Sequence, residues 1–202
     1  PIFIDFSISA FDRGIPLSNA DILKSINIGE IGEEDLDEYS KHWEYLEEKY
    51  HKGFDRFLSF VRTILLKNKP SSNLLDEYEK NIYQKNILKK GKNTIDFLIE
   101  LDGIYDKIID LNDENLSNEY KNLVTIMKLG LHSDEWIPTV LSYFLKFEYY
   151  NLDEFIKKLE YKFIGDLMSN VSPSKRRENL NNIIKTIEIV SKENMDILFE
   201  NR

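Results

Sequence analysis

The chain has 202 residues and a mass of 23.9 kDa, which suits one domain of ordinary size. Its 27 Lys and Arg residues and 36 Asp and Glu residues give a net charge of −9. The surface as a whole is therefore a poor match for nucleic acid or an anionic membrane, although a local basic patch can still bind either. The absence of cysteine excludes disulfides, thiol nucleophiles and cysteine-ligated metal sites, and no apolar run reaches the length of a membrane span.

The first predicted element is a strand. Ile2–Ile8 is short, apolar and partly alternating, which is typical of a half-buried strand. Almost everything after it predicts helix. Ser18 is expected to cap a helix over about Asn19–Ile28, with Asp21 completing a capping box, and Gly29 interrupts the pattern.

Apolar residues then recur at helical spacing along the rest of the chain. From Glu33 they follow one stripe to Tyr50, and a second stripe runs from Phe54 to Leu65, before Pro70. The later pattern predicts a weaker helix over Leu74–Leu88, a helix through Ile95–Ile109, one over Ser117–Leu129, one capped by Asp134 with Pro138 near its start, one beginning at Asn151 and a last one beginning at Pro173. These elements predict an all-α, multi-helix, bundle-like domain with one short N-terminal strand.

One motif resembles a known family. Gly14-Ile15-Pro16-Leu17-Ser18-Asn19-Ala20-Asp21-Ile22-Leu23-Lys24 is similar to the Gly-x-Pro-Leu-Ser-x-Ala-Asp-x-x-Lys signature of the GmrSD-type family, which contains modification-dependent restriction endonucleases and related phage-defence proteins. In that family the signature closes a ParB-like domain and opens a helical region. The resemblance therefore implies that residues 1–28 are the end of a preceding ParB-like domain and that residues 29–202 form the helical domain.

The sequence also departs from the family. Phe11 stands where the family usually has Asn, and the chain contains neither the family's Asp-Gly-Gln-Gln-Arg motif nor its His-Asn-His motif. The resemblance thus implies an interior fragment of a cytoplasmic protein, which links a sensing and NTP-hydrolysing domain to a nuclease without catalytic activity or a cofactor of its own. Its expected partners are other domains of the same protein and, in the full-length protein, DNA.

Four cationic residues are candidates for binding phosphate or DNA. Arg13 and Lys24 flank the start of the first predicted helix, where unpaired backbone amides favour an anion. Arg176 and Arg177 follow Lys175 near the start of the last helix, where positive charge opposes the helix dipole. The alternatives are a purely structural strand–turn–helix junction at the first helix and, at the last, pairing with acidic neighbours such as Glu178 or Asp166.

The three histidines, His42, His51 and His132, show no spacing typical of metal ligands, so no metal site and no catalytic residue is predicted. Two other functions stay open. The first alternative is a helical protein–protein interaction module without a nucleic-acid role. It predicts a protein partner or a homodimer. The second alternative, a stand-alone enzyme, is the weakest of the three hypotheses. It would require a pocket that holds carboxylates with shifted pKa values, which a sequence cannot reveal.

Overall fold

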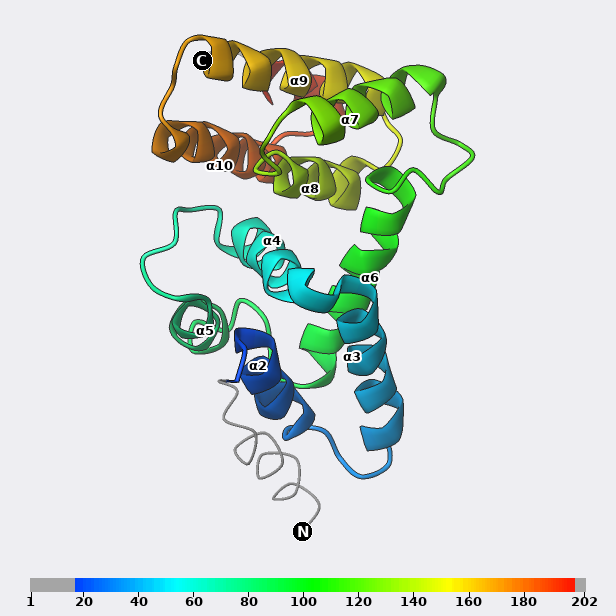
Figure 1. The fold of residues 1–202 in the computed structure, drawn as a ribbon, viewed down its shortest axis with the longest axis vertical. Helices are drawn as coiled ribbons and strands as arrows, with labels where there is room; N and C mark the ends of the chain where they lie inside the picture. Colours follow the sequence, from blue (N-terminus) through cyan, green and yellow to red (C-terminus); the bar gives the residue numbers. More distant parts are fainter. Residues whose placement is uncertain (1–16, 199–202) are drawn as a thin grey trace. The chain divides into compact units, whose positions relative to one another are not determined.

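The computed structural model describes residues 17–198, except the side chains of Met195 and Asp196. Every element in this part is helical, which confirms the predicted all-α class. The elements are α2 (Asn19–Ile28), α3 (Leu36–Tyr50), η1 (His51–Gly53), α4 (Phe54–Leu66), α5 (Leu74–Asp76), the π-helix η2 (Glu77–Tyr83), α6 (Lys92–Ile108), α7 (Asn118–Gly130), α8 (Ile137–Phe147), α9 (Leu152–Met168), α10 (Pro173–Ile189) and the 3₁₀ segment η3 (Lys192–Leu198) (Figure 1). The strand predicted over Ile2–Ile8 lies outside the described residues.

The chain forms two compact units, each built from separate stretches of sequence. Among the described residues, unit 1 contains 17–59 and 72–97, and unit 2 contains 60–71 and 98–198. The division falls within α4 and α6 rather than after Ile28. Since α2 contacts α3 and α5 inside unit 1, the assignment of residues 1–28 to a preceding domain stays a prediction.

The first helix begins as predicted. Ser18 Oγ accepts a hydrogen bond from the Asp21 amide at 3.1 Å, and the Asp21 carboxylate accepts one from the Ser18 amide at 2.8 Å. Both halves of a capping box are therefore present, and two of the backbone amides that a helix start leaves unpaired are satisfied. Gly29 provides the C-cap.

A buried asparagine joins three parts of unit 1. The Asn27 side chain is fully buried, and its Nδ2 donates to the Leu23 carbonyl at 2.8 Å and to the Tyr83 hydroxyl at 2.9 Å. Its Oδ1 accepts from the Gly91 amide at 3.1 Å. Gly91 has φ +79°, and a Cβ placed there would lie 3.3 Å from the Cβ of Glu30. Asn27 therefore ties α2 to η2 and to the turn before α6, and glycine fits that turn best.

The predicted helix over Leu74–Leu88 is shorter than expected and changes its winding. Three α-helical residues lead into η2, which ends at Tyr83. The wider π-helical turn brings residues five apart onto one side, so the buried rings of Tyr78 and Tyr83 meet edge to face at 5.9 Å between centroids. Tyr78 then donates to the Leu58 carbonyl at 3.0 Å. Burying both tyrosines with bonded hydroxyls explains why this winding is preferred over a regular α-helix.

Unit 2 contains two helical hairpins, α7–α8 and α9–α10, in which α7 contacts α9 and α8 contacts α10. At the starts of α7 and α9, Ser117 Oγ donates to Asp153 Oδ1 at 2.7 Å. At the ends of α8 and α10, Lys146 Nζ donates to the Ile187 carbonyl at 2.8 Å. Each contacting pair therefore runs in the same direction, as expected when consecutive hairpins stack.

The start of α8 differs from the prediction. The cap was expected at Asp134, but the N-cap position lies two residues further along the chain, so the predicted helix start is wrong. The N-cap is Trp136, and Pro138 stands in the first turn. The Trp136 indole is buried and donates to the Ser133 carbonyl at 3.1 Å, which fixes the chain before the helix. None of the helices described is both long and apolar enough to cross a lipid bilayer.

Candidate anion-binding site

The last long helix places three cations in its first turns. α10 begins at Pro173 as predicted, and the Ser172 side chain caps it by accepting from the Lys175 amide at 3.3 Å. Lys175, Arg176 and Arg177 follow directly. Because the capped helix start itself carries partial positive charge, these side chains need negative partners elsewhere.

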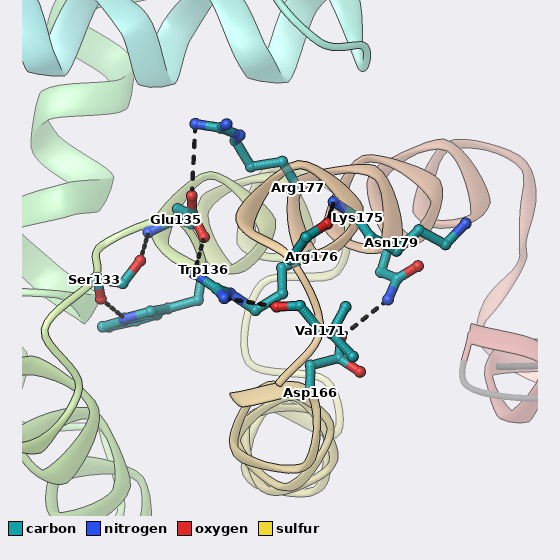
Figure 2. A network of polar contacts seen from close by, with 10 residues as sticks. Ser133, Glu135, Trp136, Asp166, Val171, Lys175, Arg176, Arg177 and Asn179 are labelled. Carbon is teal, nitrogen blue, oxygen red and sulfur yellow. Dashed lines mark hydrogen bonds and ion pairs between the residues drawn. The ribbon is translucent and has the colours of Figure 1, made fainter. Parts of the chain in front are cut away.

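Glu135 is the carboxylate on which both arginines converge (Figure 2). Arg176 Nη2 lies 3.5 Å from Glu135 Oε2, and Arg177 Nη1 lies 3.7 Å from Glu135 Oε1. Glu135 and Arg176 are each only 13% exposed, whereas Arg177 is 52% exposed. Glu135 comes from the segment just before α8, so the contact joins the starts of α8 and α10.

Arg176 makes further contacts inside unit 2. Its Nη1 donates to the Val171 carbonyl at 2.9 Å, and its guanidinium lies over the Phe163 ring, 5.9 Å from the centroid. Its Nε atom, in contrast, is buried without a hydrogen-bond partner. A guanidinium has five N–H donors, so the present partners leave part of its donor capacity unused.

Of the two acidic neighbours that the sequence suggested as partners, Glu178 pairs with a cation of this cluster and Asp166 does not. Glu178 accepts from Lys175 at 3.2 Å and from Lys69 at 3.4 Å, and these lysines lower the pKa of its carboxyl. Asp166 instead pairs with Lys162 and accepts from Asn179 Nδ2 at 3.0 Å. Glu178 is therefore a partner of this basic cluster, and Asp166 is bound to other residues.

A carboxylate also stands at the start of α2, where an anion was expected. Asp55 Oδ1 accepts from the Ala20 amide at 3.1 Å, and Asp55 Oδ2 accepts from Asn19 Nδ2 at 2.8 Å. The capping box also occupies the backbone amides of Ser18 and Asp21. The backbone amides that would have bound phosphate are thus engaged within unit 1, while Arg13 lies outside the described residues.

Lys24, another of the four candidates, belongs to a tight ion pair. Its Nζ lies 2.8 Å from Glu47 Oε2, and its side chain is only 18% exposed. The other oxygen of Glu47 accepts from the indole nitrogen of the fully buried Trp43 at 2.9 Å. Lys24 therefore stabilises unit 1, whereas Arg176 and Arg177 are the two candidates that the structure brings together.

Sequence reasoning missed the three carboxylates that contact these candidates, namely Glu47, Asp55 and Glu135. Glu47 had a local signal, because it follows Trp43 by four residues on one helical face. Asp55 and Glu135 had none, since their contacts join residues 35 and 41 positions apart. Among residues 17–198, apart from the side chains at 195 and 196, no group of His, Asp and Glu is arranged to hold a metal ion. Comparison with known proteins gives no matching family model, no matching characterised protein and no matching solved structure.

Proposed function

We propose that this chain is a non-catalytic helical module that holds other domains of a GmrSD-like DNA-restriction or phage-defence protein. The observation that carries the proposal is a group of large apolar side chains left in solvent on two contacting helices of unit 2. Leu129 is 78% exposed, Tyr161 is 81% exposed and Met168 is 80% exposed, while Ile126 of α7 is 52% exposed. These four residues are called the α7/α9 surface below.

The ion pair between the two helices places most of this surface on one side. Glu119 of α7 lies 3.6 Å from Lys157 of α9. Residues that are four, seven or eleven positions apart lie on the same face of a helix. Ile126 follows Glu119 by seven residues, and Tyr161 and Met168 follow Lys157 by four and eleven. These three residues therefore lie on the helix faces that carry the Glu119–Lys157 ion pair. Leu129 is one turn beyond Ile126. α7 and α9 run in the same direction (Figure 1). All four residues fall in the C-terminal halves of these two contacting helices.

An apolar surface of this kind favours a protein partner over nucleic acid. Single exposed apolar residues are common, whereas a group of large ones on adjacent helices is typical of an interaction surface. The tight pairing of Lys24 with Glu47 points in the same direction, because it leaves this candidate cation engaged inside unit 1. The family assignment rests on the Gly14–Lys24 motif, whose helical half forms the capped start of α2.

Cysteine labelling tests the proposal, because the chain contains no cysteine of its own. We would introduce Leu129→Cys or Met168→Cys, with Ile87→Cys as the matched control at an exposed position of unit 1. Labelling by a maleimide is followed by mass spectrometry in the isolated chain and in the protein as its gene encodes it. We expect Leu129→Cys and Met168→Cys to react more slowly in the encoded protein, with Ile87→Cys unchanged.

Two results would count against this function. Equal labelling rates in both forms would mean that no other domain covers the α7/α9 surface. A rate that falls only as the concentration of the isolated chain rises would identify a second copy as the occupant, and the chain would then be a dimerising module.

A further inference from the structure

Unit 2 concentrates positive charge around the start of α10 in a protein that is acidic overall. Four cations, Lys69, Lys175, Arg176 and Arg177, share two carboxylates in the ion pairs of this cluster. The whole chain carries a net charge of −9. A local excess of positive charge on such a chain favours binding of an anion at this place.

The contacts of Glu135 with the two arginines are long. Charge-assisted N–H···O bonds are ordinarily about 2.7–2.9 Å, whereas Arg176 lies 3.5 Å and Arg177 lies 3.7 Å from the Glu135 oxygens. The buried Nε of Arg176 also has no partner. One carboxylate with two oxygens therefore satisfies this pair of guanidinium groups incompletely.

A phosphate group fits these donors better. It presents more acceptor oxygens than a carboxylate and binds arginine through parallel N–H···O bonds. The approach is open on the side of Arg177, whose side chain is 52% exposed, while Glu135 and Arg176 are each 13% exposed. Glu135 can be replaced there only by another anion, because an unpaired, largely buried Arg176 would be costly.

We propose that Glu135 is a displaceable internal carboxylate, and that a phosphate group takes its place on Arg176 and Arg177. The source of the phosphate is either inorganic phosphate or the phosphodiester backbone of nucleic acid. This inference is independent of the α7/α9 surface, which lies on other helices, so the two proposals fail or succeed separately.

The test compares Glu135→Gln with the wild-type chain and with Glu178→Gln, a control that removes the carboxylate shared by Lys69 and Lys175. Thermal unfolding is measured in sodium phosphate and in sodium chloride of equal ionic strength, and phosphate affinity is measured by calorimetry. We expect Glu135→Gln to bind phosphate about tenfold more tightly than the wild type, since one competing charged interaction is gone. Glu178→Gln should bind phosphate with nearly wild-type affinity, because Glu178 pairs with Lys69 and Lys175 and not with the two arginines.

A second variant covers the case in which Glu135→Gln does not fold. Arg177→Gln changes a half-exposed side chain, and it should abolish the stabilisation that phosphate gives to the wild-type chain. A duplex DNA arm, repeated at several salt concentrations, separates the sources: binding of both ligands identifies a nucleic-acid backbone, and binding of phosphate alone identifies a free or small-molecule phosphate. The proposal is overturned if phosphate stabilises Glu135→Gln no more than Glu178→Gln, or stabilises Arg177→Gln as much as the wild type.

Discussion

Glu47 serves two donors at once in unit 1, the ammonium of Lys24 and the indole N–H of Trp43, at 2.8 and 2.9 Å. The Trp43 indole is fully buried, and a buried donor that loses its acceptor costs about 1–3 kcal/mol. Glu47→Ala should therefore lower the free energy of unfolding by about 1–3 kcal/mol, read from the shift of the urea midpoint.

The control for this prediction lies on the same helix. Lys41 pairs with Asp37, but the two side chains are 69% and 86% exposed. Solvent screens exposed pairs of this kind, so they contribute little to stability, and Lys41→Ala should shift the midpoint only slightly. Equal shifts for the two variants would show that Glu47 contributes no more than an ordinary surface charge.

At the scale of the helix, local signals in the sequence predict many ends and fail at others. Ser18, Asp21 and Pro173 are near-neighbour signals, and the helices begin where these residues indicate. The expected cap at Asp134 is wrong, because the buried Trp136 and Pro138 decide where α8 begins. The π-helix η2 was not foreseen either, since it depends on bonds from Tyr78 and Tyr83 to residues far away in sequence.

The end of α10 depends on a lysine from another helix. Lys146 Nζ donates to the carbonyls of Ile187, Glu188 and Val190 at 2.8, 2.7 and 2.7 Å. A cation at a helix C-terminus satisfies carbonyls that the helix leaves unpaired and interacts favourably with the dipole. Lys146→Met should therefore destabilise unit 2 by about 1–2 kcal/mol and speed amide exchange in the last turn of α10.

Lys185→Met is the matched control, because Lys185 is an exposed lysine on α10 itself. It should leave both the urea midpoint and the exchange of the last turn nearly unchanged. If Lys146→Met behaves in the same way, the end of α10 is held by its apolar packing alone.

For the molecule as a whole, composition and periodicity predict an all-α chain, and the described residues confirm it. The division into two units was not predicted. It falls inside α4 and α6, whose apolar stripes continue through the boundary without a break in pattern. The candidate site could be predicted only in part. The sequence indicates the cations of α10 from their position in the first turn, but Glu135 is placed beside them only by the contact between α8 and α10.

Net charge and the α7/α9 surface act against each other in the isolated chain. At pH 7 the charge of −9 makes copies of the chain repel one another, which opposes association through exposed apolar residues. The repulsion disappears as the pH approaches the isoelectric point of about 5.0.

We therefore expect sedimentation velocity to show monomers at pH 7 and reversible association as the pH falls toward that point. The double substitution Leu129→Ser with Tyr161→Ser should suppress the association, because it removes one highly exposed apolar group from each helix and leaves the net charge unchanged. Ile87→Ser, at an exposed position outside the surface, should not. If the double variant associates as strongly as the wild type, contact between copies at low pH runs through another face, and the α7/α9 surface loses its support as the dominant interaction site of the chain.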